Sequence, residues 1–338
     1  MSIWTTPERD QLRKTVRVFT EREILPHIDD WERVGEIPRE LSRRTAEAGL
    51  LGVGFPEEVG GEGGDAADTA IICEELHEAG TPGGVFASLF TVGIAVPHMI
   101  NSGDRRLIEE FVRPTLRGEL IGSLAITEPG GGSDVGHLRT TAVRDGDHYV
   151  VNGTKTYITS AVRGDYVVAA VRTGGAKLPG AAGISLLVVE KGTAGFEVSR
   201  TLEKMGWRSS DTAELSFTDA RVPVANLVGT PHSGFAQIAQ AFVSERIGLA
   251  VQAYSSAQRC LDITVRWCRD RETFGRPLIS RQTVQNTLAE MARRTDVARV
   301  YSRNVIERQL VGAAETTSDR GENTLITAAC FAKNTAVE

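Results

Sequence analysis

Apolar residues in the first third of the chain recur at the spacing of an amphipathic helix. Leu12, Val16 and Phe19 lie three or four residues apart, and charged residues fill the positions between them. This period places the apolar side chains on one buried face. Prolines recur throughout the stretch, and proline favours turns or helix ends. We therefore predict several helices, separated by turns, between about residues 7 and 117.

From about residue 119 to residue 228 the apolar residues follow the period of two that is typical of strands. Asn152–Gly153 and Asp145–Gly146 are dipeptides that favour tight turns between antiparallel strands. Short strands joined by such turns are typical of a compact β-barrel or sandwich. The predicted strands cover residues 149–151, 156–159, 166–171, 184–189, 196–198 and 213–217.

The helical period returns in the last third and extends over longer segments. We predict helices over residues 234–271, 282–312 and 324–337, and long helices with short connections favour an antiparallel bundle. The chain is thus expected to have an α+β fold in three domains. These are an N-terminal α-helical domain (1–118), a central β-barrel or sandwich domain (119–228) and a C-terminal helical bundle (229–338).

Composition narrows the functional classes. The 338 residues are 41% hydrophobic and 24% charged, which is typical of a globular protein and excludes a disordered or collagen-like chain. The net charge of −6, with both signs spread along the chain, argues against a dedicated nucleic-acid binder. Scattered histidines and four distant cysteines predict no metal site and reduced, buried thiols.

The chain carries no obvious targeting segment. No apolar run approaches the roughly 20 residues of a transmembrane helix, and the first ten residues are acidic and lack the apolar core of a leader. Only six of the 38 basic residues are lysine, a composition that suggests a GC-rich bacterial genome. We therefore expect a cytoplasmic, bacterial protein.

Six short segments occur in an order that resembles the acyl-CoA dehydrogenase family. Residues 125–134 read AITEPGGGSD, and residues 151–159 read VNGTKTYIT. The other four segments cover residues 203–208, 217–223, 244–250 and 271–277. The resemblance extends over nearly the whole chain and implies the same order of helical, β and helical domains. It also implies FAD as the cofactor and α,β-dehydrogenation of an acyl-CoA thioester to the trans-2-enoyl-CoA. In that reaction a carboxylate removes the α-proton while the β-hydride passes to flavin N5.

Glu245 is the candidate base. In the isovaleryl-CoA and long-chain types of the family, the catalytic glutamate stands at this place, just before an arginine. Glu245 also falls on an apolar helical stripe with Phe235, Ile238, Phe242 and Leu249. Burial there would raise the carboxyl pKa toward neutrality, as a general base requires. The alternative interpretation is a glutamate paired with Arg246 or with another helix.

The resemblance places Ile126, Thr127, Tyr157 and Thr159 beside the flavin ring. Alternation along a strand would put Tyr157 and Thr159 on one face. The glycine run that follows Thr127 allows a flat ring to approach the backbone, and short hydroxyls can hydrogen-bond to it. Without the resemblance, a glycine-rich turn and an ordinary core pair would explain the same residues.

Further residues are implied at the substrate and between subunits. Ser133 and Arg246 are expected on the substrate side. Arg271, Phe274 and Gln282 match the segment that reaches the FAD of a neighbouring subunit, and arginine suits a pyrophosphate because it donates two parallel hydrogen bonds. A structural arginine at 246 and a charged helix end at 271 are the alternatives. The implied partners are an acyl-CoA, an electron-transferring flavoprotein and further copies of the chain in a homotetramer.

Two features depart from the family pattern. His137 stands where a small residue is usual. The family also continues past the equivalent of Glu338 with a Gly-Gly loop and a segment that carries the catalytic glutamate in the medium-chain type, so the C-terminal bundle is expected to be truncated. A flavin-dependent oxidase or monooxygenase of the same superfamily remains an alternative function. A non-catalytic partner subunit of a hetero-oligomeric acyl-CoA dehydrogenase is the other.

Overall fold

The computed structural model describes residues 2–175, 178–311 and 324–338. They form two compact units, each assembled from separate stretches of the chain. The helical unit comprises Met1–Pro26, Gly64–Gly83 and Phe242–Glu338. The sheet unit comprises His27–Gly63 and Gly84–Ala241. The division into three consecutive domains stays a prediction.

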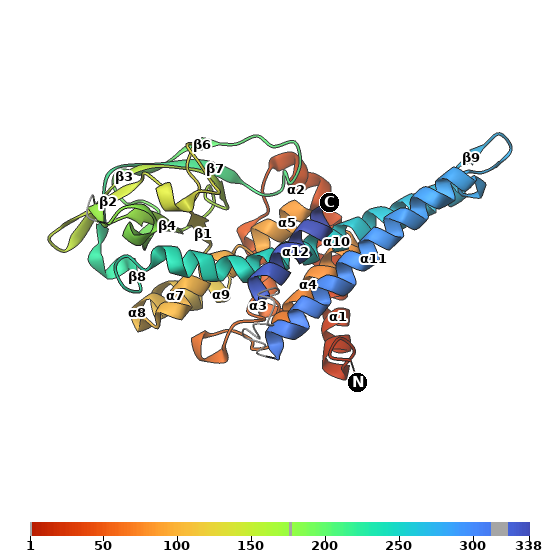
Figure 1. Ribbon diagram of the computed structural model, residues 1–338, viewed down its shortest axis with the longest axis horizontal. Helices are drawn as coiled ribbons and strands as arrows, with labels where there is room; N and C mark the ends of the chain where they lie inside the picture. Colours follow the sequence, from red (N-terminus) through yellow and green to blue (C-terminus); the bar gives the residue numbers. More distant parts are fainter. Residues whose placement is uncertain (1, 176–177, 312–323) are drawn as a thin grey trace. The chain divides into compact units, whose positions relative to one another are not determined.

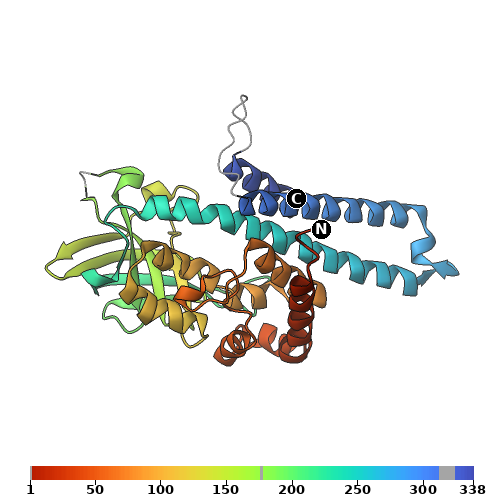
Figure 2. The ribbon, with the colours of Figure 1, turned by 90° about the horizontal axis from the view of Figure 1, so that it is seen from below.

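Long helices dominate the helical unit, and two of them, α10 and α11, form an extended antiparallel hairpin (Figures 1 and 2). Helix α1 packs against α4, and both α4 and α12 pack against α11. The bounds are α1 (Pro7–Phe19), α4 (Ala66–Ala79), α10 (Gly234–Asp270, which enters this unit at Phe242), α11 (Gln282–Leu310) and α12 (Leu325–Val337). The three predicted C-terminal helices are confirmed, although residue 312, the predicted end of the second, lies outside the described residues.

A buried charge network joins the helices of this unit. Glu74 on α4 is 1% exposed and accepts hydrogen bonds from Tyr254 Oη (2.6 Å) on α10 and from Arg303 Nη2 (2.7 Å) on α11. The Arg303 guanidinium also lies 4.7 Å from the ring centre of Trp4. A buried carboxylate is tolerated when it is paired and hydrogen-bonded in this way, so the network fixes α4, α10 and α11 to one another.

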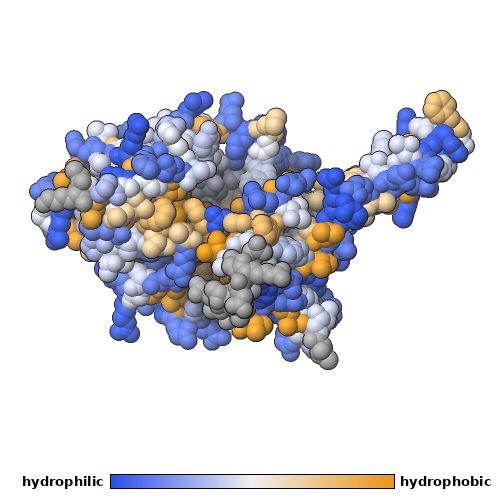
Figure 3. Space-filling view, in the orientation of Figure 1, coloured by the Kyte–Doolittle hydropathy of each residue, from blue (hydrophilic) through white to orange (hydrophobic). Residues whose placement is uncertain are grey.

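A two-stranded turn forms the tip of the α10–α11 hairpin. Strands β9 (Glu272–Thr273) and β10 (Arg276–Pro277) pair antiparallel around Phe274, whose φ is +52°. The Arg281 guanidinium donates to the carbonyl oxygen of Thr273 and lies 5.5 Å from the Phe274 ring centre. Phe274 is nevertheless 97% exposed, and Figure 3 shows an apolar group at the end of the hairpin.

One open sheet forms the centre of the sheet unit. Its strand order is β6-β7-β3-β2-β4-β5-β8, and β1 pairs with β4. Strands β1 and β2 run parallel to β4, whereas the other pairs are antiparallel. The bounds are β1 (Gly122–Ala125), β2 (Thr141–Asp145), β3 (His148–Thr159), β4 (Tyr166–Arg172), β5 (Ile184–Glu190), β6 (Phe196–Thr201), β7 (Thr212–Pro223) and β8 (Leu227–Val228). The α+β fold class is confirmed, and among the described strands β6 and β8 do not pair to close a barrel.

Short helices complete the sheet unit and confirm the predicted helical character of the first third of the chain. They are α2 (Ile28–Val34), α3 (Arg39–Glu47), α5 (Gly83–Leu89), α6 (Val92–Ala95), α7 (Pro97–Ser102), α8 (Arg105–Leu107) and α9 (Arg113–Leu116). Strands β4 and β5 are buried along almost their whole length. The Phe111 ring meets the Tyr166 ring edge-on at 5.1 Å, so the chain before α9 covers β4.

Three sequence predictions need correction. Asn152–Gly153 is no hairpin turn, because β3 runs unbroken through it with a bulge in its pairing with β7. The turn after Asp145 is confirmed, since Asp145 pairs with His148. Strands β1, β2 and β8 were not predicted. Cys260 is exposed rather than buried.

Within residues 2–175, 178–311 and 324–338, no single helix combines the length and apolar composition that a membrane span requires. One pair of helices bent by 51°, Gly83–Leu89 and Val92–Ser102, reaches them together, by length and composition only.

Candidate active site

Glu245 lies on α10 as a half-buried carboxyl group. Its Oε1 atom is buried and has no hydrogen-bond partner in the part of the chain that the structure describes. Burial raises the pKa of the Glu245 carboxyl to about 7, and the neighbouring Arg246 opposes that shift only in part. A carboxyl of this kind exchanges its proton near neutral pH, which suits a general acid or base.

Arg246 does not neutralise Glu245. Its Nη1 atom donates to the carbonyl oxygen of Phe242 (3.2 Å), one turn back along α10. Its guanidinium lies 5.7 Å from the Phe242 ring centre. Among the described residues, no cationic side chain lies within 4.0 Å of the Glu245 carboxylate. The part of the chain that the structure describes therefore shows no ion pair at Glu245.

A depression of about 340 Å³ opens at Glu245 between α10 and α12. Its lining residues are Phe242, Glu245, Arg246 and Leu249 from α10, with Cys330, Lys333 and Asn334 from α12. Sequence reasoning missed the α12 residues, because nothing in the pattern indicates which helix faces Glu245. The apolar stripe predicted around Glu245 is also buried only in part, since Phe235 and Leu249 are exposed and Ile238 is buried.

The two segments predicted to contact the flavin ring lie side by side in the sheet unit. The backbone N–H of Thr156 donates to the carbonyl oxygen of Thr127 (2.9 Å). Lys155 Nζ donates to the carbonyl oxygen of Ile126 (3.0 Å). The loop that leaves β1 therefore runs along the end of β3, and Ile126 and Thr127 are neighbours of the segment that carries Tyr157.

Tyr157 projects from a bulge in β3. The pairing of β3 with β7 shifts register between Lys155 and Ile158, and Tyr157 has φ +60°. Tyr157 is 69% exposed, Ile158 is buried and Thr159 is half-buried. The expected alternation thus holds from Tyr157 to Thr159, whereas it fails just before, where Lys155 and Thr156 are both buried.

Ser133 lies on an exposed turn after the first motif. Glu128 and Gly131 form an isolated bridge, and a Cβ atom built on Gly130 or Gly131 would meet nothing within 4 Å. The turn therefore leaves open space at its glycines. The Nδ1 atom of His137, the departure from the family pattern, forms a hydrogen bond with Asp134 Oδ1 (2.8 Å).

Arg271, Phe274 and Gln282 gather at the hairpin tip and are exposed. Neither the Arg271 guanidinium nor the Gln282 amide makes a side-chain hydrogen bond to a described residue. Arg271 follows Glu245 by 26 positions, so about 39 Å of helix separates the two. The tip is thus a separate location from the Glu245 depression within the helical unit.

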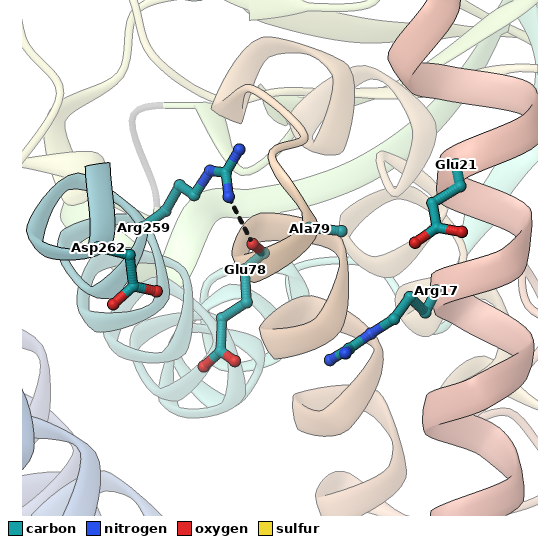
Figure 4. A pocket seen from close by; sticks show the side chains of 6 residues that line it. All are labelled: Arg17, Glu21, Glu78, Ala79, Arg259 and Asp262. Carbon is teal, nitrogen blue, oxygen red and sulfur yellow. Dashed lines mark hydrogen bonds between the residues drawn. The ribbon is translucent and has the colours of Figure 1, made fainter. Parts of the chain in front are cut away.

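A second cavity, of about 290 Å³, lies among α1, α4 and α10 (Figure 4). Its lining residues are Arg17, Glu21, Glu78, Ala79, Arg259 and Asp262. Arg259 donates to the carbonyl oxygen of Glu78 (3.4 Å), and Arg17 donates to Glu75 (2.6 Å). The charged side chains that line this cavity are of both signs and are already paired in part. They therefore do not form a catalytic or ligand-binding arrangement.

Three consecutive family models match most of the chain. They describe the N-terminal domain (residues 6–119), the middle domain (123–220) and the C-terminal domain (232–338) of acyl-CoA dehydrogenases. The chain is 38% identical over 294 residues to the mitochondrial long-chain specific acyl-CoA dehydrogenase of Rattus norvegicus, covering 87% of this chain and 68% of the rat protein.

Two further relatives extend the comparison. A crystal structure assigned to an acyl-CoA dehydrogenase of Mycobacterium smegmatis superposes with a TM-score of 0.94 at 73% identity, covering 99% of this chain and 85% of that one. The NADH-dependent acryloyl-CoA reductase of Anaerotignum propionicum is 36% identical over 302 residues, covering 88% of this chain and 75% of the reductase.

Proposed function

Because the chain belongs to the acyl-CoA dehydrogenase family, whose members are FAD-dependent oxidoreductases, we propose that it oxidises an acyl-CoA thioester to the trans-2-enoyl-CoA with Glu245 as the base. The observation that carries this proposal is the state of the Glu245 carboxyl. Its buried Oε1 has no partner among the described residues, and its pKa is about 7. It can therefore accept the substrate α-proton near neutral pH.

The residues of the sheet unit fit a flat, hydrogen-bonding cofactor. Tyr157 exposes its ring from the bulge, and the hydroxyls of Thr127 and Thr159 make no hydrogen bond within the described residues. The open space at Gly130 and Gly131 lets a planar group approach the backbone. When bound, FAD would supply the acceptor for the β-hydride. Ile126, Thr127, Tyr157 and Thr159 would hold and orient its ring.

The remaining residues support binding and assembly. Ser133 and Arg246 would contact the thioester substrate, and Arg271, Phe274 and Gln282 would reach the FAD of a neighbouring copy in a homotetramer. These three tip residues are exposed, and the side chains of Arg271 and Gln282 make no hydrogen bond to a described residue, which supports that assignment. An electron-transferring flavoprotein would then reoxidise the flavin, in the cytoplasm of a bacterial cell.

An anaerobic visible spectrum tests the proposal. The purified chain should show flavin absorption that bleaches when a suitable acyl-CoA is added from a panel of straight and branched thioesters. Glu245→Gln should retain the flavin but lose the bleaching. A protein that binds no flavin, or a Glu245→Gln variant that bleaches at the normal rate, would contradict the proposal. Bleaching by NADH followed by recovery with an enoyl-CoA would instead favour the reductive direction of the acryloyl-CoA reductase relative.

A further inference from the structure

A lysine and a glutamate form a buried ion pair behind the Ile126–Thr127 segment. Lys155 on β3 is 0% exposed and Glu128 is 8% exposed. Lys155 Nζ lies 2.9 Å from Glu128 Oε1 and donates a second hydrogen bond to the Ile126 carbonyl oxygen at 3.0 Å. Neither residue belongs to the groups assigned above to cofactor, substrate or proton transfer.

The Glu128 carboxylate collects donors from a third segment of the chain. Its Oε2 accepts from the backbone N–H of Arg139 (2.6 Å), and its Oε1 accepts from the backbone N–H (2.9 Å) and the hydroxyl (2.6 Å) of Thr140. Both oxygens are therefore hydrogen-bonded. A buried carboxylate with both oxygens hydrogen-bonded resists displacement, because movement would leave a buried charge without its partners.

The bulge in β3 explains how the Lys155 side chain is buried and reaches the Ile126 carbonyl oxygen. Regular alternation would place Lys155 and Thr156 on opposite faces, but the register shift after Lys155 leaves both buried. Lys155 can then reach the Ile126 carbonyl while the next residue, Thr156, binds the Thr127 carbonyl through its N–H. One residue later, Tyr157 is directed outward.

We propose that Lys155 and Glu128 are a positioning pair that fixes the Ile126–Thr127 segment against the Tyr157 bulge and thereby sets the flavin-binding surface. This inference rests on the flavin contacts proposed above. The pair joins three segments, at residues 126–128, 139–140 and 155–156, through five hydrogen bonds centred on two side chains. Without it, the Ile126 carbonyl would lose its donor and the loop would be held to β3 mainly by the Thr156–Thr127 bond.

The test compares retention of FAD with stability of the fold. Lys155→Met keeps an unbranched side chain only one atom shorter but removes the charge and both hydrogen bonds. Tyr166→Phe is the matched control, because it removes a buried hydrogen bond to Thr115 (3.0 Å) elsewhere in the same unit. Each FAD-loaded variant is diluted into buffer at a temperature well below its melting temperature. The release of FAD is followed by the fluorescence of the free cofactor. We expect release at least about tenfold faster for Lys155→Met and near the wild-type rate for Tyr166→Phe.

A double variant keeps the test decisive if Lys155→Met does not fold. Lys155→Met/Glu128→Gln removes both charges and leaves no unpaired ion. Its melting temperature should be closer to that of the wild type, yet it should still release FAD faster than the wild type. The visible absorption band of its flavin should be less structured, because water reaches a loosely held ring. Wild-type release and an unchanged band in a folded Lys155 variant would overturn the positioning role. If the wild-type chain itself bound no FAD, the proposed function would fail instead.

Discussion

The Glu245 carboxyl is partly buried and has no compensating ion-pair partner among the residues that the structure describes. The nearest cation on its own helix, Arg246, is turned toward the Phe242 carbonyl and ring. The effect of desolvation therefore exceeds the opposing effect of the Arg246 charge, and the pKa of the Glu245 carboxyl rises to about 7. The same neighbour that looks like an ion-pair partner in the sequence leaves the carboxyl free to exchange a proton.

The rate of flavin reduction should follow the ionisation of Glu245. A base with a pKa of about 7 is mostly protonated at pH 6 and mostly ionised at pH 8, so the rate should rise about tenfold between these values and then level off. Stopped-flow bleaching with a saturating acyl-CoA measures it. The variant Glu245→Gln should be slower by a factor of about 10² to 10⁴ and should lack this pH dependence. A flat wild-type profile from pH 6 to pH 8 would contradict the assignment.

The ionised Glu245 side chain should also lower the free energy of unfolding at alkaline pH. Its folded-state pKa is raised, so the folded state disfavours ionisation and the penalty grows as pH rises from about 4.5 to about 7. Glu245→Gln removes this titration. It should unfold at a higher denaturant concentration than the wild type at pH 8, with a gain of roughly 1–3 kcal/mol, and should differ little at pH 4.5. A variant that is less stable at pH 8 would argue against a strained, uncompensated carboxylate.

The sequence indicated Glu245 but not Lys155, and the reason is physical. A glutamate on an apolar helical stripe is visible because the helix period is regular. Lys155 is buried because of a bulge, and the bulge depends on pairing with β7 rather than on local residue preferences. Lysine is normally exposed, so the residue itself gave no signal of burial.

At the scale of elements, long helices were the most predictable. α10 ends and α11 begins beside the charged turn around Phe274, where the apolar period is interrupted. β2 was missed because four of its five residues are exposed and carry little apolar signal. The Asn152–Gly153 dipeptide predicts a turn, whereas the structure has a continuous strand there. Gly153 is required by a close approach within the sheet: a Cβ atom there would lie 2.6 Å from the Thr140 hydroxyl.

Gly153→Ala should therefore destabilise the sheet unit. The new methyl group would overlap Thr140, and the backbone has φ +149°, which disfavours side chains. We expect a loss of roughly 2 kcal/mol or more in the free energy of unfolding. Gly93→Ala is the control, because its Cβ meets nothing within 4 Å and it lies in helix α6. Equal melting temperatures for the Gly153 variant and the wild type would contradict the close approach of Gly153 to Thr140.

The hairpin tip offers a matched pair of arginines. Arg271→Ala removes the cation proposed to bind FAD, and Arg269→Ala removes an exposed cation two residues earlier on α10. Both should change stability by less than about 0.5 kcal/mol, because both side chains are exposed. Only Arg271→Ala should weaken FAD binding, by about 10- to 100-fold, as expected for a charge-assisted hydrogen bond. FAD content after exhaustive dialysis measures the difference, and equal retention by the two variants would remove Arg271 from the cofactor site.

At the scale of the whole molecule, sequence order and spatial grouping diverge. The helical unit takes α1 and α4 from the first third of the chain and adds them to the C-terminal helices. Side-chain hydrogen bonds between distant segments hold these helices together, such as those from Trp4 Nε1 to Glu307 Oε1 (2.7 Å) and from Arg303 to Glu74. Helical period predicts that each helix has a buried face, but it carries no information on which distant helix will cover that face.

Assembly can be tested by mixing two defective chains. Arg271→Ala retains Glu245 but lacks the tip cation, whereas Glu245→Gln retains the cation but lacks the base. If each FAD site is completed by the tip of a neighbouring copy, a mixed pair contains one complete site, formed by Glu245 of one chain and Arg271 of the partner subunit. In a symmetric interface with random pairing, co-expression should restore about a quarter of the wild-type activity. Mixing the two purified variants without subunit exchange should restore none. Activity at the level of the separate variants after confirmed co-assembly would mean that each chain completes its own site.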